Sequence, residues 1–159
     1  MRSTIVVRFI NMNGLVGRSI DWVTASLFSH VEFGTPEGTW IGAHDTGGIQ
    51  ERPADYCVPS RDYRYAVPCS ERQSITALAW MRSKVGTPYN FSDIAGLLLR
   101  ARRLTSPDRM ICSQFVFDGL DHVFPGKVLN ALPAYSYLIT PETLHLSPIF
   151  VGHRVVVRG

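Results

Sequence analysis

The chain has 159 residues, enough to bury the hydrophobic core of one domain, and we expect a single domain over residues 1–159. Hydrophobic residues make up 45% and charged residues 18%, which argues against intrinsic disorder. The formal net charge of +3 is mild, and no repeating basic and aromatic pattern indicates a nucleic-acid groove, so no nucleic-acid partner is expected.

The first half of the chain is predicted to form mainly strands. A β-branched run predicts a strand over residues 3–10, and apolar residues at roughly helical spacing predict a short helix over residues 14–28. Three extended pieces, separated by the turn-forming stretches TPEG and TGG, follow at residues 29–34, 39–45 and 49–56. Alternating aromatic and aliphatic residues predict a further strand over residues 62–69. The connections are too short for parallel crossovers, so we expect an antiparallel meander.

The second half is predicted to be mainly helical. Ser70 as N-cap and Gly86 as stop signal bound the first helix, a second begins near Ser92, and a third covers residues 108–124. The tail is punctuated by proline and irregular, with a possible last strand over residues 152–159. Strands first and helices after indicate an α+β domain, with an antiparallel sheet packed against helices.

The three cysteines are too few and too irregularly spaced for a disulfide framework or a zinc knuckle. Cys57 and Cys69 have no base nearby in the sequence and are interpreted as packing residues. Cys112 precedes an apolar-faced helix, and if that helix begins near Ile111, the unpaired amides of its first turn would stabilise a thiolate. Two alternatives stand beside this one. Cys112 is a small buried packing residue, or Ser106 caps the helix and Cys112 lies more than a turn inside it.

Two histidines lie on neighbouring predicted strands. Alternation puts His30 and Glu32 on one strand face, and Val31 and Phe33 on the other, so His30 is expected to face a cleft or solvent. The TPEG turn favours a hairpin that brings His44 beside His30, where one imidazole acts as base and the other orients it. Such a pair also suits a metal ion, but no third ligand with convincing spacing accompanies it, so we expect no metal and no other cofactor.

Other polar residues are further candidates for this site. Glu32 and Glu51 are alternative orienting groups, because a carboxylate on the second imidazole nitrogen would do the same work as His44. Tyr89 lies on a turn that leads towards a helix, where it either lines the cleft beside the nucleophile or merely packs.

An ordered set of five stretches carries a resemblance to a known family. They are SHVEF, WIGAHDTGG, GTPYNFSDI, MICSQFVFDGL and ITPETLHLSPIF. Together, over roughly residues 5 to 150, they resemble the circularly permuted NlpC-like cysteine hydrolases of papain-like fold. The YiiX-like branch is most similar, and lecithin:retinol acyltransferase-like enzymes are more distant. The resemblance implies an antiparallel half-barrel sheet packed against helices, with the histidine strand before the cysteine helix.

The resemblance also implies roles for individual residues. Cys112 matches the family nucleophile, His30 its base, His44 the third polar position, and Tyr89 the aromatic residue of the family's turn. Glu32 departs from the pattern, because relatives often have a small or apolar residue two positions after the base histidine. A carboxylate there would raise the pKa of His30 or select a substrate with a cationic group.

We therefore expect a cysteine peptidase or amidase that cleaves an amide bond in a cell-wall peptide, with a peptidoglycan fragment or another acyl amide as its partner. One alternative is acyl transfer, or lipid or thioester deacylation, by the same residues, using an apolar channel lined by residues 94–99 and the tail. Another is a binding module without turnover. No secretory leader and no membrane-spanning run is recognised, so the protein is expected in the cytoplasm as synthesised, in a bacterial or phage setting with release by lysis or by a dedicated export route.

Overall fold

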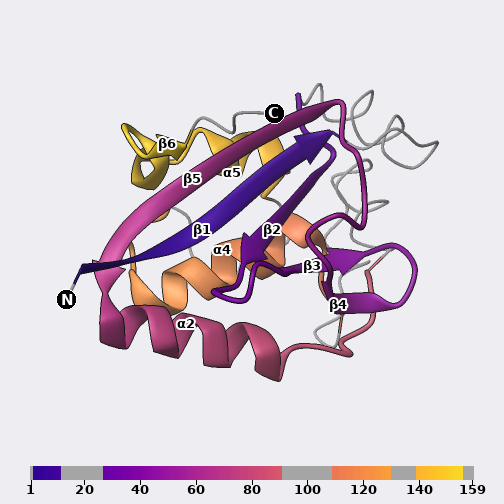
Figure 1. Ribbon diagram of the computed structural model, residues 1–159, viewed down its shortest axis with the longest axis horizontal. Coiled ribbons are helices and arrows are strands. Elements are labelled where there is room, and N and C mark those ends of the chain that lie inside the picture. The colour runs from indigo at the N-terminus through magenta and orange to yellow at the C-terminus, as the bar shows by residue number, and fades with distance from the viewer. Residues whose placement is uncertain (1, 12–26, 91–108, 130–138, 156–159) are drawn as a thin grey trace.

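The computed structural model describes residues 2–11, 27–90, 109–129 and 139–155. Within them, one antiparallel six-stranded sheet has the order β4-β3-β2-β1-β5-β6 (Figure 1). The strands are β1 (Arg2–Asn11), β2 (His30–Gly34), β3 (Trp40–His44), β4 (Gly48–Arg52), β5 (Arg61–Ser70) and β6 (Arg154–Val155). The helices are α2 (Glu71–Ser83), α4 (Cys112–Val123), α5 (Pro141–His145) and the short 3-10 helix η3 (Pro148–Phe150). The α+β prediction is confirmed.

The sheet is a meander only in part. Strands β1 to β4 follow one another across the sheet, as the short TPEG and TGG turns predict. Strand β5 then returns to the other side of β1 and pairs with it along its whole length, from Arg2–Ser70 to Asn11–Arg61. The first strand is therefore central, and β1 holds the sheet together from the middle (Figure 1).

Helix α2 begins and ends at the signals in its sequence. Ser70 accepts a hydrogen bond from the Gln73 amide, and the Gln73 side chain bonds back to the Ser70 amide, which completes a capping box. The helix ends at Ser83, and Gly86, with φ of +93°, turns the chain away in a conformation that favours glycine.

Helices α2 and α4 cover the same face of the sheet, where α2 contacts β1 and β5 and α4 contacts β2 and β3. The ring of Phe33 on β2 meets that of Phe115 on α4 edge to face, at 5.6 Å between centroids. Gly119 allows this close approach, because a Cβ there would lie 2.9 Å from the Phe33 ring. Val31 and Phe33 thus face the helical core as alternation predicts, which leaves His30 and Glu32 on the opposite face.

The tail differs from the irregular segment that was predicted. It forms the short helix α5, capped by Thr140, and η3, capped by Ser147. Of the predicted last strand over residues 152–159, Arg154 and Val155 form β6 and pair with β5, while residues 156–159 lie outside the described residues. Most of the predicted helix over residues 14–28, and the predicted helix from Ser92, lie outside the described residues.

Candidate active site

Cys112 is the first residue of α4, and Ile111 is the N-cap. The prediction that the helix begins near Ile111 is confirmed, so Cys112 does not lie a turn inside it. The cap supplies no side-chain hydrogen bond, so no cap side chain satisfies the first-turn amides beside the sulfur. These amides carry the positive end of the helix dipole.

A backbone bridge brings Tyr89 to Cys112. The Asn90 amide donates to the Met110 carbonyl at 3.2 Å, and the Met110 amide donates to the Pro88 carbonyl at 3.2 Å. This pairing lies two residues before Cys112. Burial raises the pKa of Tyr89, and the negative charge of Cys112 raises it further, so the phenol stays protonated beside the sulfur. Tyr89 is buried, with only 7% of its surface exposed.

His30 lies between Cys112 and Glu32. The imidazole Nε2 is 3.5 Å from Glu32 Oε2, and the Cys112 side chain is close enough to raise the pKa of His30. Burial alone would lower the pKa of His30, but the hydrogen bonds and negative charges of Cys112 and Glu32 raise it to about 10. The result is an imidazolium held between a sulfur and a carboxylate.

The face that carries His30 is not open to solvent as the alternation pattern suggested. His30 is 6% exposed, Glu32 is completely buried, and His44 is 4% exposed. Cys112, itself 4% exposed, meets His30 because each is the first residue of its element, at the end of α4 and of β2. The site is therefore closed over by side chains rather than displayed on a strand face.

His44 lies beside His30 as the hairpin prediction requires. The two ring centroids are 4.7 Å apart and the planes are tilted by 35°. Burial, the charge of His30 and that of Arg52 lower the pKa of His44 to about 2, so His44 is neutral. Both His30 Nε2 and His44 Nε2 are buried without a hydrogen-bond partner among the described residues. His44 thus lies beside the His30 ring at a tilt, while a carboxylate oxygen of Glu32 lies near the His30 Nε2 nitrogen.

The structure does not bring Glu51 to His30. This carboxylate lies on β4, accepts from the Thr39 hydroxyl at 2.6 Å and pairs with Arg82 at 3.1 Å. These partners hold its pKa below the usual range, as expected for a surface ion pair.

Sequence reasoning missed the groups that hold Glu32. Arg8 Nη1 lies 3.1 Å from Glu32 Oε1, and Arg8 also binds Asp62 at 3.0 Å. The Tyr56 hydroxyl donates to Glu32 Oε2 at 2.9 Å. Arg8 was visible in the sequence as a lone charge within the apolar run STIVVRFI, a position where an arginine is buried only if it is paired. No sequence signal marks Tyr56.

Glu32 also supplies the third ligand that the sequence pattern lacked. One donor atom from each of His30, Glu32 and His44 lies within 4.8 Å of the others. A third possible donor therefore does accompany the two histidines. A Cβ at Gly42 would lie 3.0 Å from His30 Nε2 and 3.4 Å from Glu32 Oε2, so the missing side chain leaves space beside two of the three donors.

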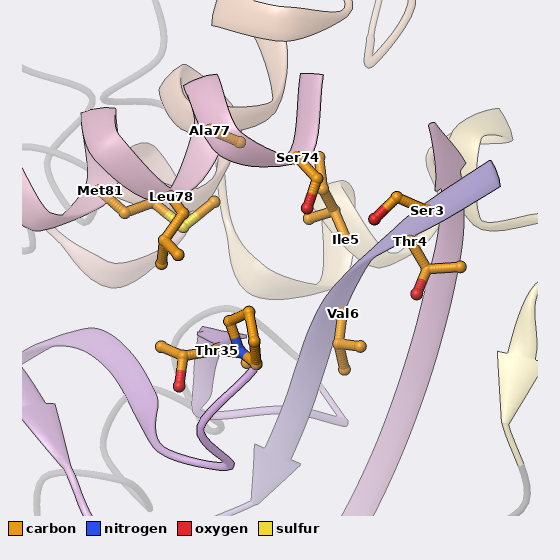
Figure 2. A pocket seen from close by; sticks show the side chains of 11 residues that line it. Ser3, Thr4, Ile5, Val6, Thr35, Ser74, Ala77, Leu78 and Met81 are labelled. Atoms are coloured by element: carbon orange, nitrogen blue, oxygen red, sulfur yellow. The ribbon is translucent and has the colours of Figure 1, made fainter. Parts of the chain in front are cut away.

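Two hollows lie away from these residues. One of about 260 Å³ is bounded by β1, the turn after β2 and α2, with Ile5, Ala77 and Met81 in its lining (Figure 2). The other, of about 350 Å³, lies beside Tyr65 and His145. Neither is lined by Cys112 or His30. Neither is the apolar channel that acyl transfer would use, and residues 94–99, which were expected to line it, lie outside the described residues.

The environment of His30 predicts a pH-dependent stability. A histidine whose pKa rises from 6.5 unfolded to about 10 folded adds stability that is complete below about pH 6.5 and is lost as the pH rises through about 10. Urea unfolding of the wild type and of His30→Gln, in chelator, should give a difference in unfolding free energy that shrinks across this window. If the difference in unfolding free energy between the wild type and His30→Gln stays constant with pH, His30 is not held as an imidazolium in the folded protein.

No protein-family model matches this sequence, and no curated protein is significantly similar to it. The fold does match the crystal structure of the metalloprotein YiiX from Escherichia coli O157:H7, designated DUF1105, with a TM-score of 0.67. The match covers 98% of this chain and 97% of that chain at 15% sequence identity. The chain therefore shares the fold of YiiX, as its sequence resemblance to the YiiX-like branch implied. Among the described residues, no helix is both long and apolar enough to cross a bilayer.

Proposed function

We propose that this protein is a thiol hydrolase that cleaves an amide bond, with Cys112 as nucleophile and His30 as the group that carries the proton. The observation that carries the proposal is the proximity of His30 to a cysteine at the first position of α4, close enough for Cys112 to raise the pKa of His30. An imidazolium on one side and helix amides on the other both favour the thiolate, the reactive form of cysteine.

The reaction follows from these positions. The Cys112 sulfur attacks the carbonyl carbon, and the negative charge that develops on the carbonyl oxygen is held by the first-turn amides of α4. The protonated Tyr89 hydroxyl, buried beside the sulfur, is our candidate for a second donor. His30 gives its proton to the departing amine as the carbon–nitrogen bond breaks, which leaves a thioester. Neutral His30 then takes a proton from water, whose oxygen attacks the thioester and releases the acid and Cys112.

We propose Glu32 rather than His44 as the group that orients His30. Glu32 Oε2 lies 3.5 Å from His30 Nε2 and carries the charge that favours imidazolium, whereas neutral His44 lies against the face of the ring. Arg8 and Tyr56 fix the carboxylate from its other side. The departure from the family pattern at Glu32 thus has a use within the site.

For the substrate we propose an amide in a cell-wall peptide. The support is the resemblance to NlpC-like hydrolases and the fold shared with YiiX. Acyl transfer by the same residues would form the same thioester and differ only in the acceptor. Incubation with peptidoglycan fragments and with acyl thioesters, followed by intact mass and product analysis, separates hydrolysis from transfer to an amine or alcohol.

Thiol labelling tests the proposed nucleophile without a known substrate. Cys112 is 4% exposed, whereas Cys57 and Cys69 are both half-buried, and burial raises the pKa of Cys69. If solvent exposure decides how fast each thiol is alkylated, iodoacetamide labels Cys57 or Cys69 first. If the imidazolium of His30 and the α4 amides decide it, Cys112 is labelled first at neutral pH.

We expect Cys112 to react first, and we expect His30→Gln to slow Cys112 while leaving the other two rates unchanged. Peptide mass mapping over a time course measures all three rates in one sample. If Cys112 reacts last of the three cysteines, and at the same rate in the wild type and in His30→Gln, then this thiol has only a packing role.

YiiX, whose fold this chain shares, is named a metalloprotein, and we propose that this chain can hold a metal ion as well. Two imidazole nitrogens and a carboxylate oxygen are a donor set that suits zinc, and His30, His44 and Glu32 provide it. Bound there, such an ion would supply Lewis acidity.

A further inference from the structure

We infer that the hollow beside Tyr65 and His145 is a binding site for a small aromatic carboxylic acid, whose carboxylate is held by Arg154 and by the Tyr65–His145 pair. The hollow has a volume of about 350 Å³, within the usual range for small-molecule sites. Its lining comes from β5, the end of α5, η3 and β6, which lie together at one edge of the sheet (Figure 1). Neither Cys112 nor His30 lines it, so such a site is independent of the proposed hydrolase.

Tyr65 and His145 form a hydrogen-bonded pair in the lining, with 2.7 Å between the Tyr65 hydroxyl and His145 Nε2. Burial lowers the pKa of His145, so its ring is neutral and carries one proton. If the hydroxyl donates to Nε2, that proton is on Nδ1, a buried nitrogen with no hydrogen-bond partner among the described residues. If Nε2 donates instead, the hydroxyl hydrogen is the one that lacks an acceptor there. In both cases one donor needs an oxygen atom, and a bound carboxylate supplies it.

Arg154 brings a positive charge to the same hollow. Its guanidinium carbon lies 3.7 Å from the centroid of the Tyr63 ring, a cation–π contact that orients the group. Within the described part of the chain, no carboxylate forms an ion pair with Arg154. Glu142 of α5 does not line the hollow, and it accepts a hydrogen bond from the Leu27 amide at 3.0 Å. An exposed guanidinium therefore remains for a carboxylate, the planar anion that it binds best.

Aromatic and aliphatic groups supply the rest of the lining. The Tyr65 and Phe150 rings lie 5.1 Å apart between centroids, with their planes tilted by 50°. Leu146 and Val151 line the same hollow, although these apolar side chains are 72% and 74% exposed. An aromatic ligand would cover both side chains and pack against the Phe150 ring. The charged and apolar parts of the lining together select an aromatic acid.

The hollow beside α2 lacks this combination. Its polar lining is made of hydroxyl groups, among them those of Ser3, Thr35 and Ser74, and no charged side chain lines it (Figure 2). Nothing in that hollow selects one class of ligand over another.

Titration of the whole ¹⁵N-labelled protein with 2-naphthoate, followed by its amide NMR signals, tests the site. We expect the signals of Leu146, Val151 and Gly152 to shift, because these residues line the hollow. The neutral 2-naphthamide has the same two rings but no charge, and it should bind at least about 10-fold more weakly.

Two variants of exposed residues separate the roles of charge and apolar surface, and both should stay folded. Arg154→Gln should weaken binding of 2-naphthoate by about 10-fold and leave that of 2-naphthamide unchanged. Leu146→Ser should weaken binding of both ligands by about 2- to 5-fold, because it removes apolar contact. The matched control is Arg64→Gln, which removes a cation from the neighbouring position on β5, over the Trp40 ring and outside the lining. Its affinity for 2-naphthoate should equal that of the wild type.

Three results would overturn the site. One is that millimolar 2-naphthoate leaves the signals of Leu146, Val151 and Gly152 in place, whether or not it shifts those around Cys112. The second is that Arg154→Gln binds 2-naphthoate as tightly as the wild type does. The third is that 2-naphthamide binds as tightly as 2-naphthoate, which would show that the carboxylate is not recognised.

Discussion

Arg8→Met is expected to destabilise the fold by about 3–5 kcal/mol, the cost of removing one partner from a buried ion pair. Arg8 is 2% exposed and Glu32 is completely buried, so the variant leaves a carboxylate without its cation and without water. Methionine fills most of the volume of the arginine stem, so a cavity contributes little to this loss. Urea unfolding followed by circular dichroism measures the change.

Arg64→Met is the matched control for Arg8. Like Arg8, Arg64 binds the carboxylate of Asp62 and lies over the ring of Trp40, but the Arg64 side chain is 30% exposed. Surface ion pairs contribute little, so its loss should be below about 1 kcal/mol. Adding Glu32→Gln to Arg8→Met should recover much of the lost stability, because a neutral amide no longer needs the cation. Equal losses for Arg8→Met and Arg64→Met would contradict a special role for the buried pair.

The Arg8–Glu32 ion pair links the central strand of the sheet to the candidate catalytic residues. Arg8 lies at the centre of β1, the central strand, directly opposite Glu32 in the register with β2. Two residues along β2, His30 then lies at the strand end, where α4 delivers Cys112. The orientation of the imidazole is therefore determined by the best-paired part of the sheet rather than by a loop, which is how a site gains precise geometry.

Features encoded by neighbours in the chain could be predicted from the sequence. The strand alternation at SHVEF and the short TPEG turn were sufficient to place His30 beside His44. The N-cap Ser70 and the stop residue Gly86 predicted the two ends of helix α2. The apolar face of MICSQFVFDGL predicted that α4 starts near Cys112. Each of these predictions depends on the spacing of residues that lie close together in the sequence.

Features that depend on distant contacts could not be predicted this way. The partners of Glu32 come from Arg8 and Tyr56, each 24 positions away, and only the folded register brings them together. Burial on both faces of β2 likewise depends on what covers it, not on its own alternation. In the sequence, Glu51 was an equally good candidate for the group that orients His30. Its ion pair with Arg82 of α2 forms only in the tertiary structure.

The largest effects on chemistry should appear in deacylation of Cys112. An activated ester such as 4-nitrophenyl acetate should acylate Cys112 with a burst, and Cys112→Ala should abolish both the burst and the acyl adduct. Hydrolysis of the thioester then needs His30 as base, so His30→Gln should slow deacylation by about 10²–10⁴-fold. Stopped-flow absorbance and intact mass follow the two steps separately, in chelator, so that metal binding does not contribute.

The same measurement decides which neighbour orients His30. Glu32→Gln removes the charge that faces Nε2 but keeps one amide oxygen that accepts from Arg8, and the Tyr56 hydroxyl can accept from the new amide nitrogen, so the fold should persist while deacylation slows by about 10²-fold. His44→Gln removes a neutral ring that lies tilted beside His30, and it should slow deacylation less than about 10-fold, since it takes no charge from the imidazolium. If His44→Gln instead slowed deacylation as much as His30→Gln while Glu32→Gln did not, the carboxylate would be structural and His44 would be the orienting group.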